Sequence, residues 1–388
     1  MTTLLYSGYY NSDKEVYPFE VDPNFFYLTS CDLPNITIIQ QSKKDYVYVE
    51  IPDTVFYDAK HFKHKLKLCF NATIIELKDV IHMLQNSKTI HTLPNINSHP
   101  HFSKFKRFHM DTTNIVTKLS KKREVKFPDE ILAIDHACKY TSGGIKQIMK
   151  SSYLGMNQLE LVGIFKHYLS KFGIQELSFN PITSHARDNS ILHYEAKNKR
   201  IKHNTLVLLD LGCKYKHYCS DISRTFPLSG KFSEKSKLIY QAVLTTLKYA
   251  LRLMKPGAHW QTITHKVKLK LYDECLNIHL VDKVDNESDK LQVISTLMPH
   301  ALGHHVGLDA HDCGPITTLK KDMVIAVEPG IYFQMGKETS PFINVQTWKE
   351  LANLGGVRIE DTIVITSKGH KNLSKVPKEM SAIENLMK

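Results

Sequence analysis

The chain has 388 residues, of which 42% are hydrophobic and 23% are charged, and its formal net charge is +12. This composition is typical of a globular protein, and no apolar run approaches the roughly 20 residues that a membrane-spanning helix requires. The beginning, MTTLLYSGYYNSDKE, lacks a basic segment followed by a long apolar one, so we expect no secretory signal. Seven cysteines without a CxxC pair favour free thiols in a reducing compartment, which predicts a cytoplasmic protein.

The first 115 residues are expected to form a small α/β domain, because short strands and helices follow one another there. A helix is predicted at 72–87, and the polar, weakly periodic stretch 95–114 is interpreted as a loop. Strands are predicted where β-branched and aromatic residues cluster between Asp, Asn and Pro, at 24–30, 36–41, 45–52 and 88–93.

Much of the positive charge lies between residues 56 and 126, where 14 Lys/Arg stand against 5 Asp/Glu, together with seven histidines. A basic surface can attract nucleic acid or acidic partners. The lysines are dispersed, however, and no nucleic-acid-binding motif is present, which favours a solvated lysine-rich face. We therefore expect neither nucleic acid nor a membrane as a partner.

The remainder, 116–388, mixes amphipathic helices and antiparallel strands without regular alternation, which predicts an α+β domain. Gly143-Gly144 interrupts the apolar face of its first predicted helix, and Gly173 is expected to end the second. Apolar residues at helical spacing predict helices at 128–152, 156–173 and 233–257. Apolar, β-branched runs predict strands at 205–212, 323–333 and 357–367.

Two aspartates mark the arms of a predicted hairpin. Asp210 ends the apolar run NTLVLLD, and Asp221 lies in the second arm, YCSDISRTFP. A two-residue turn at Tyr215-Lys216 would place the two carboxylates directly opposite, with Cβ atoms about 5 Å apart. Facing carboxylates repel and are costly without a cation or a shared proton. A divalent metal ion is the obvious remedy.

Two further acids and a histidine-rich turn join this pair. Glu328 follows MVIAV and Glu360 follows GVRI, each inside an apolar strand-like run. A lone acid in a strand is usually a solvated edge residue, but four acids together are harder to dismiss. The turn at 300–312, HALGHHVGLDAHD, holds His300 and His304 four residues apart. Its glycines, and the lack of a glutamate after the first histidine, argue against a zinc-protease helix.

Four carboxylates and one imidazole form an oxygen-rich ligand set. Such a set suits two divalent ions, Mn²⁺ above all, with Co²⁺ or Zn²⁺ as alternatives. Two ions at about 4 Å can share a hydroxide and use it as a nucleophile at neutral pH. The residues themselves therefore predict a dinuclear metal centre.

The ordered acids and histidine carry a family resemblance. LDLGCKYKHYCSDISRTFP, HALGHHVGLDAHD, VEPGIYF and GVRIEDTIVIT resemble the Xaa-Pro peptidases, namely aminopeptidase P and prolidase, which are relatives of methionine aminopeptidase. The resemblance implies a pita-bread catalytic domain at 116–388. It extends weakly, through YPFEVDPNFFYLTS, to an aminopeptidase P (creatinase) N-terminal-like domain at 1–115. Because the family commonly forms dimers, it also implies a homodimer.

The resemblance assigns metal ligands by position. Asp210 would bind one metal, His304 and Glu328 the other, while Asp221 and Glu360 would bridge both. It also gives Glu328 a role in proton transfer.

Other positions match residues around the metals rather than ligands. His193 and His311 would line the substrate pocket and steady the oxyanion or the leaving group. Arg358 and Tyr332 would orient the carboxylates. His300 matches a further active-site histidine of the family, one that is not a ligand. The alternatives are that His300, Tyr332 and Arg358 are structural. His305 is expected to pack rather than bind metal.

The implied activity is hydrolysis of the peptide bond before proline by a metal-bridging hydroxide, releasing the N-terminal residue of proline-containing peptides. A dipeptidase would need an arginine for the free proline carboxylate. CGPITTLKKDMVIAVE offers only Lys320 and Lys321, which favours the aminopeptidase. The long stretch 333–356 is closer to eukaryotic prolidase, so Xaa-Pro dipeptidase stays as the alternative. A metal-free binding module of the same fold is a third alternative, and the complete ligand set argues against it.

Overall fold

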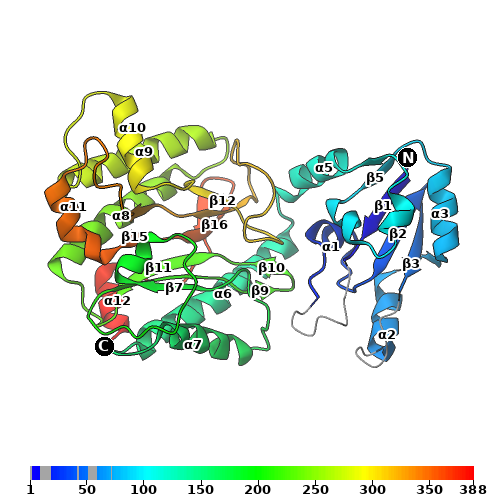
Figure 1. Ribbon diagram of the computed structural model, residues 1–388, viewed down its shortest axis with the longest axis horizontal. Coiled ribbons are helices and arrows are strands. Elements are labelled where there is room, and N and C mark those ends of the chain that lie inside the picture. Colours follow the sequence, from blue (N-terminus) through cyan, green and yellow to red (C-terminus); the bar gives the residue numbers. More distant parts are fainter. Residues whose placement is uncertain (1, 9–18, 42, 51–58, 71) are drawn as a thin grey trace. The chain divides into compact units, whose positions relative to one another are not determined.

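The computed structural model describes residues 2–8, 19–41, 43–50, 59–70 and 72–388 (Figure 1). They form two compact units, Met1–Lys122 and Arg123–Lys388. The boundary expected at 115/116 lies inside helix α5, Thr113–Arg123, whereas the first unit ends one residue before the end of that helix. No helix among the described residues combines the length and apolar character needed to cross a membrane.

One six-stranded sheet, in the order β4-β3-β2-β1-β5-β6, forms the centre of the first unit. β1, β2 and β3 are antiparallel neighbours, whereas β4, β5 and β6 join in parallel. The strands are β1 (Thr2–Tyr6), β2 (Ile36–Gln41), β3 (Lys44–Val49), β4 (Thr73–Ile74), β5 (Ile90–Thr92) and β6 (Met110–Asp111). The helices before α5 are α1 (Pro23–Thr29), α2 (Ala59–Cys69), α3 (Leu77–Gln85), η1 (Pro94–Ser98) and α4 (Phe102–Phe105).

Several predicted elements of this unit need correction. The predicted strand at 24–30 is helix α1, because the Asp22 carboxylate accepts hydrogen bonds from the backbone N–H groups of Asn24 and Phe25 at 2.9 Å. The helix predicted at 72–87 is shorter, since β4 precedes it. The predicted loop at 95–114 contains η1, α4, β6 and the start of α5. Residues 51 and 52 of the strand predicted at 45–52 lie outside the described residues.

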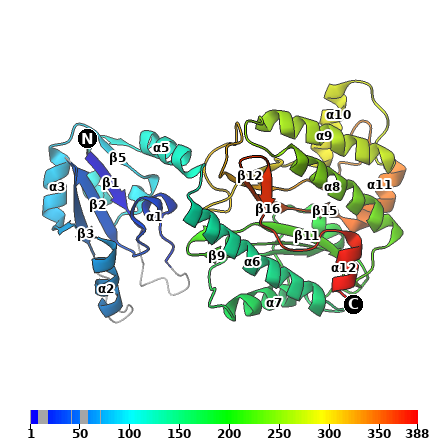
Figure 2. The same ribbon diagram turned by 180° about the vertical axis from the view of Figure 1, so that it is seen from behind.

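The second unit is the predicted α+β domain, with strands between two pairs of packed helices (Figures 1 and 2). Its larger sheets have the orders β11-β8-β7 and β12-β13-β16-β17, and β9-β10 and β14-β15 form two antiparallel pairs. The paired helices are α6 (Pro128–Ser151) with α7 (Gln158–Ser170), and α8 (Glu234–Leu253) with α9 (Trp260–Asn277). The remaining helices are α10 (Glu287–Leu297), α11 (Val345–Leu351) and α12 (Met380–Leu386), with short 3₁₀ turns η2 (Ala186–Ser190) and η3 (Ala352–Leu354).

The strands of this unit are short, and most of their residues are buried. The first sheet and its hairpin tip comprise β7 (Ile182–His185), β8 (Leu206–Leu211), β9 (Lys214–Tyr215), β10 (Tyr218–Cys219) and β11 (Ile222–Pro227). The others are β12 (Gly303–His305), β13 (Val324–Val327), β14 (Gly330–Tyr332), β15 (Gly356–Arg358), β16 (Asp361–Ile365) and β17 (His370–Asn372).

Helix α6 runs without a break through Gly143 and Gly144, in agreement with the single helix predicted at 128–152. A Cβ atom on Gly143 would lie 2.0 Å from the Tyr168 hydroxyl, and one on Gly144 would lie 2.5 Å from the Phe165 ring. Both aromatic side chains belong to α7. The glycines therefore permit the close approach of two helices and do not end one.

The hairpin that carries the aspartates has a different turn from the predicted one. Its tip is Lys216-His217, both in the left-handed region with φ of 50° and 70°. Ser223, not Asp221, consequently pairs with Asp210. Side chains in a strand alternate between its two faces, so this shift of two residues leaves both aspartates on the same face. The prediction was wrong because these bulky residues adopt a turn that usually selects Asn or Gly.

Candidate metal centre

The five predicted metal ligands lie together at the ends of neighbouring strands. In the second large sheet, Val327 pairs with Gly303 on one side and with Asp361 on the other, which brings three of the five to one end. A backbone hydrogen bond of 3.1 Å from the Glu360 N–H to the Ser223 carbonyl joins this end to β11. The five are Asp210 in β8, Asp221 before β11, His304 in β12, Glu328 after β13 and Glu360 between β15 and β16.

Their ligand atoms form overlapping sets. Asp210, Asp221 and Glu360 offer atoms within 4.8 Å of one another, and so do His304, Glu328 and Glu360. His304 Nε2 lies 3.6 Å from Asp221 Oδ2 and 3.6 Å from Glu328 Oε1. Glu360 belongs to both sets, and Asp221 faces both. The arrangement thus offers two adjacent cation positions with shared carboxylates.

A third set of possible ligand atoms includes a histidine that was predicted to line the substrate pocket. His311 offers a ring nitrogen within 4.8 Å of atoms of Asp221 and His304. Its ring centroid is 4.0 Å from that of His304. Unlike His304, His311 is exposed. It therefore stands at the solvent side of the centre, beside the ligand group.

The electrostatics of the carboxylates fit a bound cation. Burial, reinforced by the neighbouring carboxylates, raises the pKa values of Asp221 and Glu360 well above their usual range. Burial also raises the pKa of Glu328 to about 8, although Arg358 opposes the shift. Asp210 Oδ1 is buried, and no hydrogen-bond partner among the described residues reaches it. Divalent ions would relieve this repulsion and satisfy the orphan oxygen, so the residues fit a dinuclear metal site.

Arg358 holds the carboxylates of the metal centre in position through hydrogen bonds. Its guanidinium donates from Nη2 to Asp210 Oδ2 at 2.8 Å, from Nη1 to the Tyr332 hydroxyl at 3.0 Å and from Nε to Ser223 Oγ at 2.9 Å. Ser223 in turn donates to Glu360 Oε2 at 2.9 Å. Arg358 is 3% exposed. One buried arginine therefore orients two of the predicted ligands, directly and through a serine.

The hydrogen bonds of His300 leave neither of its ring nitrogens free to bind a metal ion. Its Nδ1 lies 2.8 Å from the Ala301 carbonyl, which can only accept, so Nδ1 carries the proton. Its Nε2 then accepts from the Tyr332 hydroxyl at 2.9 Å. Burial lowers the pKa of His300 to about 4, which keeps the ring neutral. His300 is thus a satisfied neighbour of the centre, 3.7 Å from the Glu328 carboxylate.

The two adjacent histidines of β12 differ in their surroundings. His304 Nδ1 faces the His305 carbonyl at 3.1 Å, which leaves Nε2 as the nitrogen aimed at Asp221 and Glu328. Burial lowers the pKa of His304 to about 4, so Nε2 has a free lone pair. His305 is 1% exposed and points to the other face of the strand. It packs there, as the sequence predicted.

A cavity of about 500 Å³ opens beside the centre. Asp210 and Asp221 form part of its wall, and His193 and His311 line it as well. The structure therefore brings the two histidines predicted for the substrate to the same pocket as two predicted metal ligands. Apolar side chains including Phe179, Pro181 and Ile182 complete the wall, which suits a peptide side chain or a proline ring.

A buried ion cluster behind the histidine turn escaped the sequence analysis. The Asp312 carboxylate, 1% exposed, binds the Arg123 guanidinium and accepts from Lys126 Nζ at 2.9 Å. The Asp312 N–H donates to the His305 carbonyl at 2.9 Å. The cluster therefore fixes the turn between His304 and His311. The only available signal was a charged pair at 123–126 and an aspartate after His311, and nothing in the sequence couples segments so far apart.

Four carboxylates and a histidine around two cation positions, in an α+β unit of this topology, define a metal-dependent hydrolase. Residues 133–367 match the model of metallopeptidase family M24. This match covers more than half of the chain, and the protein belongs to that family. The expected relationship to the Xaa-Pro peptidases and the expected pita-bread fold are confirmed.

Relatives extend over both units. A protein of Fusarium vanettenii named "Probable Xaa-Pro aminopeptidase" is 29% identical over 431 residues, covering 100% of this chain and 90% of the relative. A similarly named protein of Ajellomyces dermatitidis is 28% identical and covers 97% and 89%. The structure of Escherichia coli aminopeptidase P with the inhibitor Pro-Leu has a TM-score of 0.83 at 25% identity, covering 100% of this chain and 93% of that one.

Proposed function

We propose that this chain is an Xaa-Pro aminopeptidase, which hydrolyses the bond before proline and releases the N-terminal residue of a peptide. The observation that carries the proposal is the convergence of five metal-type ligands beside a pocket that two further histidines line. The names of the relatives from Fusarium vanettenii and Ajellomyces dermatitidis support it. The inhibitor Pro-Leu in the Escherichia coli structure supports a proline-containing substrate.

The predicted ligand roles are carried into this proposal. Asp210 would hold one ion, His304 and Glu328 the other, while Asp221 and Glu360 serve both. Mostly oxygen donors favour Mn²⁺, with Co²⁺ or Zn²⁺ as alternatives. When bound, such ions supply an activated hydroxide and polarise the scissile carbonyl.

The other groups around the pocket bind, orient and move protons. Glu328 lies between His304 and His300, at 3.6 Å and 3.7 Å, and is assigned the transfer of a proton to the proline nitrogen. That nitrogen, like any amide nitrogen, must gain a proton to leave as an amine. His193 and His311 line the pocket, where they are assigned hydrogen bonds to the developing oxyanion or the leaving group. Arg358 keeps Asp210 and Glu360 in position.

Xaa-Pro dipeptidase is the alternative, and two side chains weaken it. Lys320 and Lys321 would have to replace the arginine that recognises a free proline carboxylate. Lys320 Nζ instead donates to Glu124 at 3.1 Å, and Lys321 lies 3.6 Å from Asp322. Their side chains are 55% and 62% exposed, and neither lines the pocket. The aminopeptidase therefore remains the favoured function.

Matched peptides test the proposal. The full chain is stripped of metal with a chelator, reloaded with Mn²⁺ and given Xaa-Pro-Yaa, Xaa-Pro and Xaa-Ala-Yaa. We expect metal-dependent release of the first residue from Xaa-Pro-Yaa and little from Xaa-Ala-Yaa. Cleavage of the dipeptide alone would favour the prolidase alternative. An inactive protein with Mn²⁺, Co²⁺ and Zn²⁺ would contradict both and leave a binding module.

Three finer predictions go with this function. Mn²⁺ as the resident ion is tested by metal analysis of the purified protein. A homodimer is tested by sedimentation. A cytoplasmic location rests on the seven free cysteines, most of them buried, and is tested by fractionating cells.

A further inference from the structure

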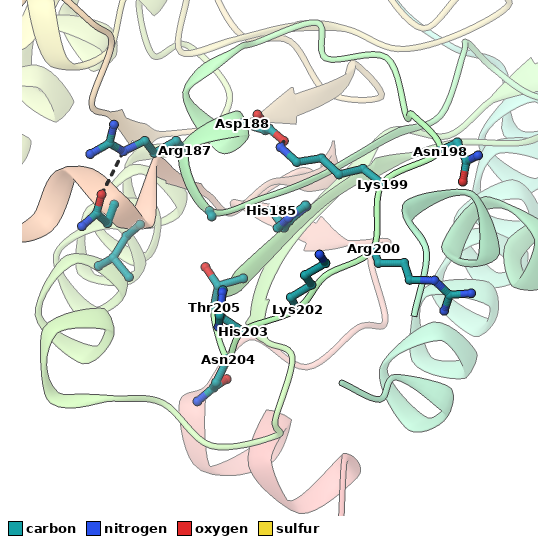
Figure 3. A pocket seen from close by; sticks show the side chains of 13 residues that line it. His185, Arg187, Asp188, Asn198, Lys199, Arg200, Lys202, His203, Asn204 and Thr205 are labelled. Atoms are coloured by element: carbon teal, nitrogen blue, oxygen red, sulfur yellow. Dashed lines mark hydrogen bonds and ion pairs between the residues drawn. The ribbon is translucent and has the colours of Figure 1, made fainter. Parts of the chain in front are cut away.

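The segment 193–205 lines two different cavities. Residues 193–195 contribute to the substrate pocket described above. Residues 198–200 and 202–205 line a second cavity of about 880 Å³, together with 185–188 and the end of η3 (Figure 3). Such a volume is in the range of small-molecule sites, roughly 300–1,000 Å³. No role in the proposed peptidase reaction falls to this second cavity.

Positive charge dominates the wall of the second cavity. Four Lys/Arg side chains line it against a single acid, Asp188, which pairs with Lys199 at 2.7 Å. In Figure 3, Lys202 extends into the cavity towards His185, whereas Arg187 and Arg200 point away to its two sides. No hydrogen bond or ion pair reaches the Lys202 ammonium from the described part of the chain. Lys202 is exposed, so the opening of the cavity carries a cation that pairs with no acid of the described residues.

A buried hydrogen-bond network sets the proton of His185. The backbone N–H of Lys197 and the Tyr194 hydroxyl donate to Gln158 Oε1, at 3.0 Å and 3.2 Å. The amide nitrogen of Gln158, which is fully buried, must then face His185 Nδ1, at 2.7 Å. Nδ1 accepts this hydrogen bond, so the neutral ring carries its proton on Nε2. His185 thus presents an N–H donor, not a lone pair, at the wall of the cavity.

We propose that this cavity binds a small phosphate-class anion, a pyrophosphate group on its own or as part of a larger molecule. The Lys202 ammonium and the His185 Nε2–H would contact its oxygens, and Lys199 would add charge at the rim. The excess of positive charge on this wall repels a cation and attracts an anion. Charge-assisted hydrogen bonds from such donors are the usual means of holding a phosphate.

The same network connects the anion site to the substrate pocket. Gln158 contacts His185 with its nitrogen and holds Lys197 and Tyr194 with its oxygen. Tyr194 is adjacent to His193, which lines the substrate pocket. An anion that fixes the His185 ring consequently restrains the segment that carries His193. Binding of an anion at this site would therefore stiffen one wall of the substrate pocket.

Calorimetric titration of the full, metal-loaded chain with inorganic pyrophosphate at constant ionic strength tests the site. Saturable binding is expected, at least about tenfold weaker in Lys202→Gln. Lys231→Gln removes the same charge from an exposed position outside the cavity and should bind like the unchanged chain. Lys202→Gln leaves the metal centre intact, so undiminished binding in this variant would show that pyrophosphate sits on the metals or on the general surface. That result, or no saturation at all, overturns the proposal.

Two further measurements report on the network. Pyrophosphate should shift the ¹⁵N resonance of His185 Nε2 and should slow amide exchange over 193–197 in the unchanged chain. Neither effect should occur in Lys202→Gln at the same pyrophosphate concentration. Binding without a change at His185 would place the anion elsewhere and refute the assigned contacts.

Discussion

Glu360 and Asp361 are adjacent, both buried, and lie in opposite electrostatic environments. Glu360 faces the metal centre, where burial and other carboxylates raise its pKa. Asp361 faces the opposite side, where Arg224 binds it at 2.7 Å and Lys378 also pairs with it. Burial alone would raise the pKa of Asp361, but these two cations outweigh it and lower the value. A buried acid whose charge is balanced by cations of its own chain is structural, whereas a group of buried acids with too few such cations indicates a set of metal ligands.

The ion cluster at Asp312, beside the histidine turn, is a second buried carboxylate that has cations of its own chain as partners. Arg123 and Lys126 supply two cations for this one buried carboxylate. The metal centre has four carboxylates and a single arginine, Arg358. Both groups of carboxylates are buried, so burial does not distinguish the ion cluster from the metal centre. The ratio of cations to carboxylates distinguishes them.

The largest expected effect is a difference in metal content and activity between variants of the two neighbouring histidines of β12. His304→Ala should lose bound metal and lower kcat/KM at least about 100-fold, because Nε2 is aimed at the ligand carboxylates. His305→Ala should keep metal and most of the activity, with a lower Tm from the cavity it leaves. Metal analysis and peptide kinetics on both variants measure the contrast. Equal metal loss in the two would refute the assignment of His304.

Replacing each of the two adjacent acids by its neutral amide tests whether they differ in charge compensation. In metal-free protein, Asp361→Asn should lose about 3–5 kcal/mol of unfolding free energy, because it strands the Arg224 charge. Glu360→Gln should cost nothing or stabilise the metal-free protein, because it removes a carboxylate from a repelling group. Urea unfolding measures both. If the two variants lose the same stability, charge balance does not distinguish the regions.

Arg358→Lys tests whether positioning matters beyond charge. Lysine keeps the positive charge but cannot donate to Asp210, Tyr332 and Ser223 together. We expect kcat/KM to fall about 10–100-fold, with folding retained. Lys231→Gln, which also alters one cation in this unit, lies outside both cavities and should leave kcat/KM unchanged. A full-activity Arg358→Lys protein would mean that only its charge is needed.

The smallest expected effect is a dependence on pH. Burial would raise the pKa of Asp312, but Lys126 and Arg123 outweigh it and hold that pKa below its usual value. A lowered folded-state pKa gives stability that is present above the unfolded value of 3.8 and is lost as pH falls through the folded value. The stability difference between the unchanged chain and Asp312→Asn should thus be constant above pH about 5 and shrink below about 4. A difference that does not change down to pH 3 would contradict the ion-pair interpretation.

The sequence predicted the family and the group of five ligands because those residues stand in short segments with distinctive neighbours. The local backbone conformation was predicted less accurately than the family and the ligands. The hairpin turn was misplaced because Lys216 and His217 adopt left-handed backbone angles that their residue types disfavour. Helix α1 was taken for a strand because its aromatic residues outweighed the Asp22-Pro23 start signal.

Charge compensation could not be predicted at all. Asp312 meets Lys126 across 186 positions, and Asp361 meets Arg224 across 137. Only the folded chain shows which acids have such partners and which do not. The same holds for Gln158, whose contacts with His185 and Lys197 bring together three separate segments.

The closely packed glycines of α6 limit how this protein can be engineered. Replacing a glycine inside a helix by alanine is a common route to higher stability, worth up to about 1 kcal/mol. At Gly143 the added methyl would overlap the Tyr168 side chain of α7, and at Gly144 it would overlap Phe165. A thermostabilisation screen that ranks residues by helix propensity would therefore select the two positions where alanine forces α6 and α7 apart.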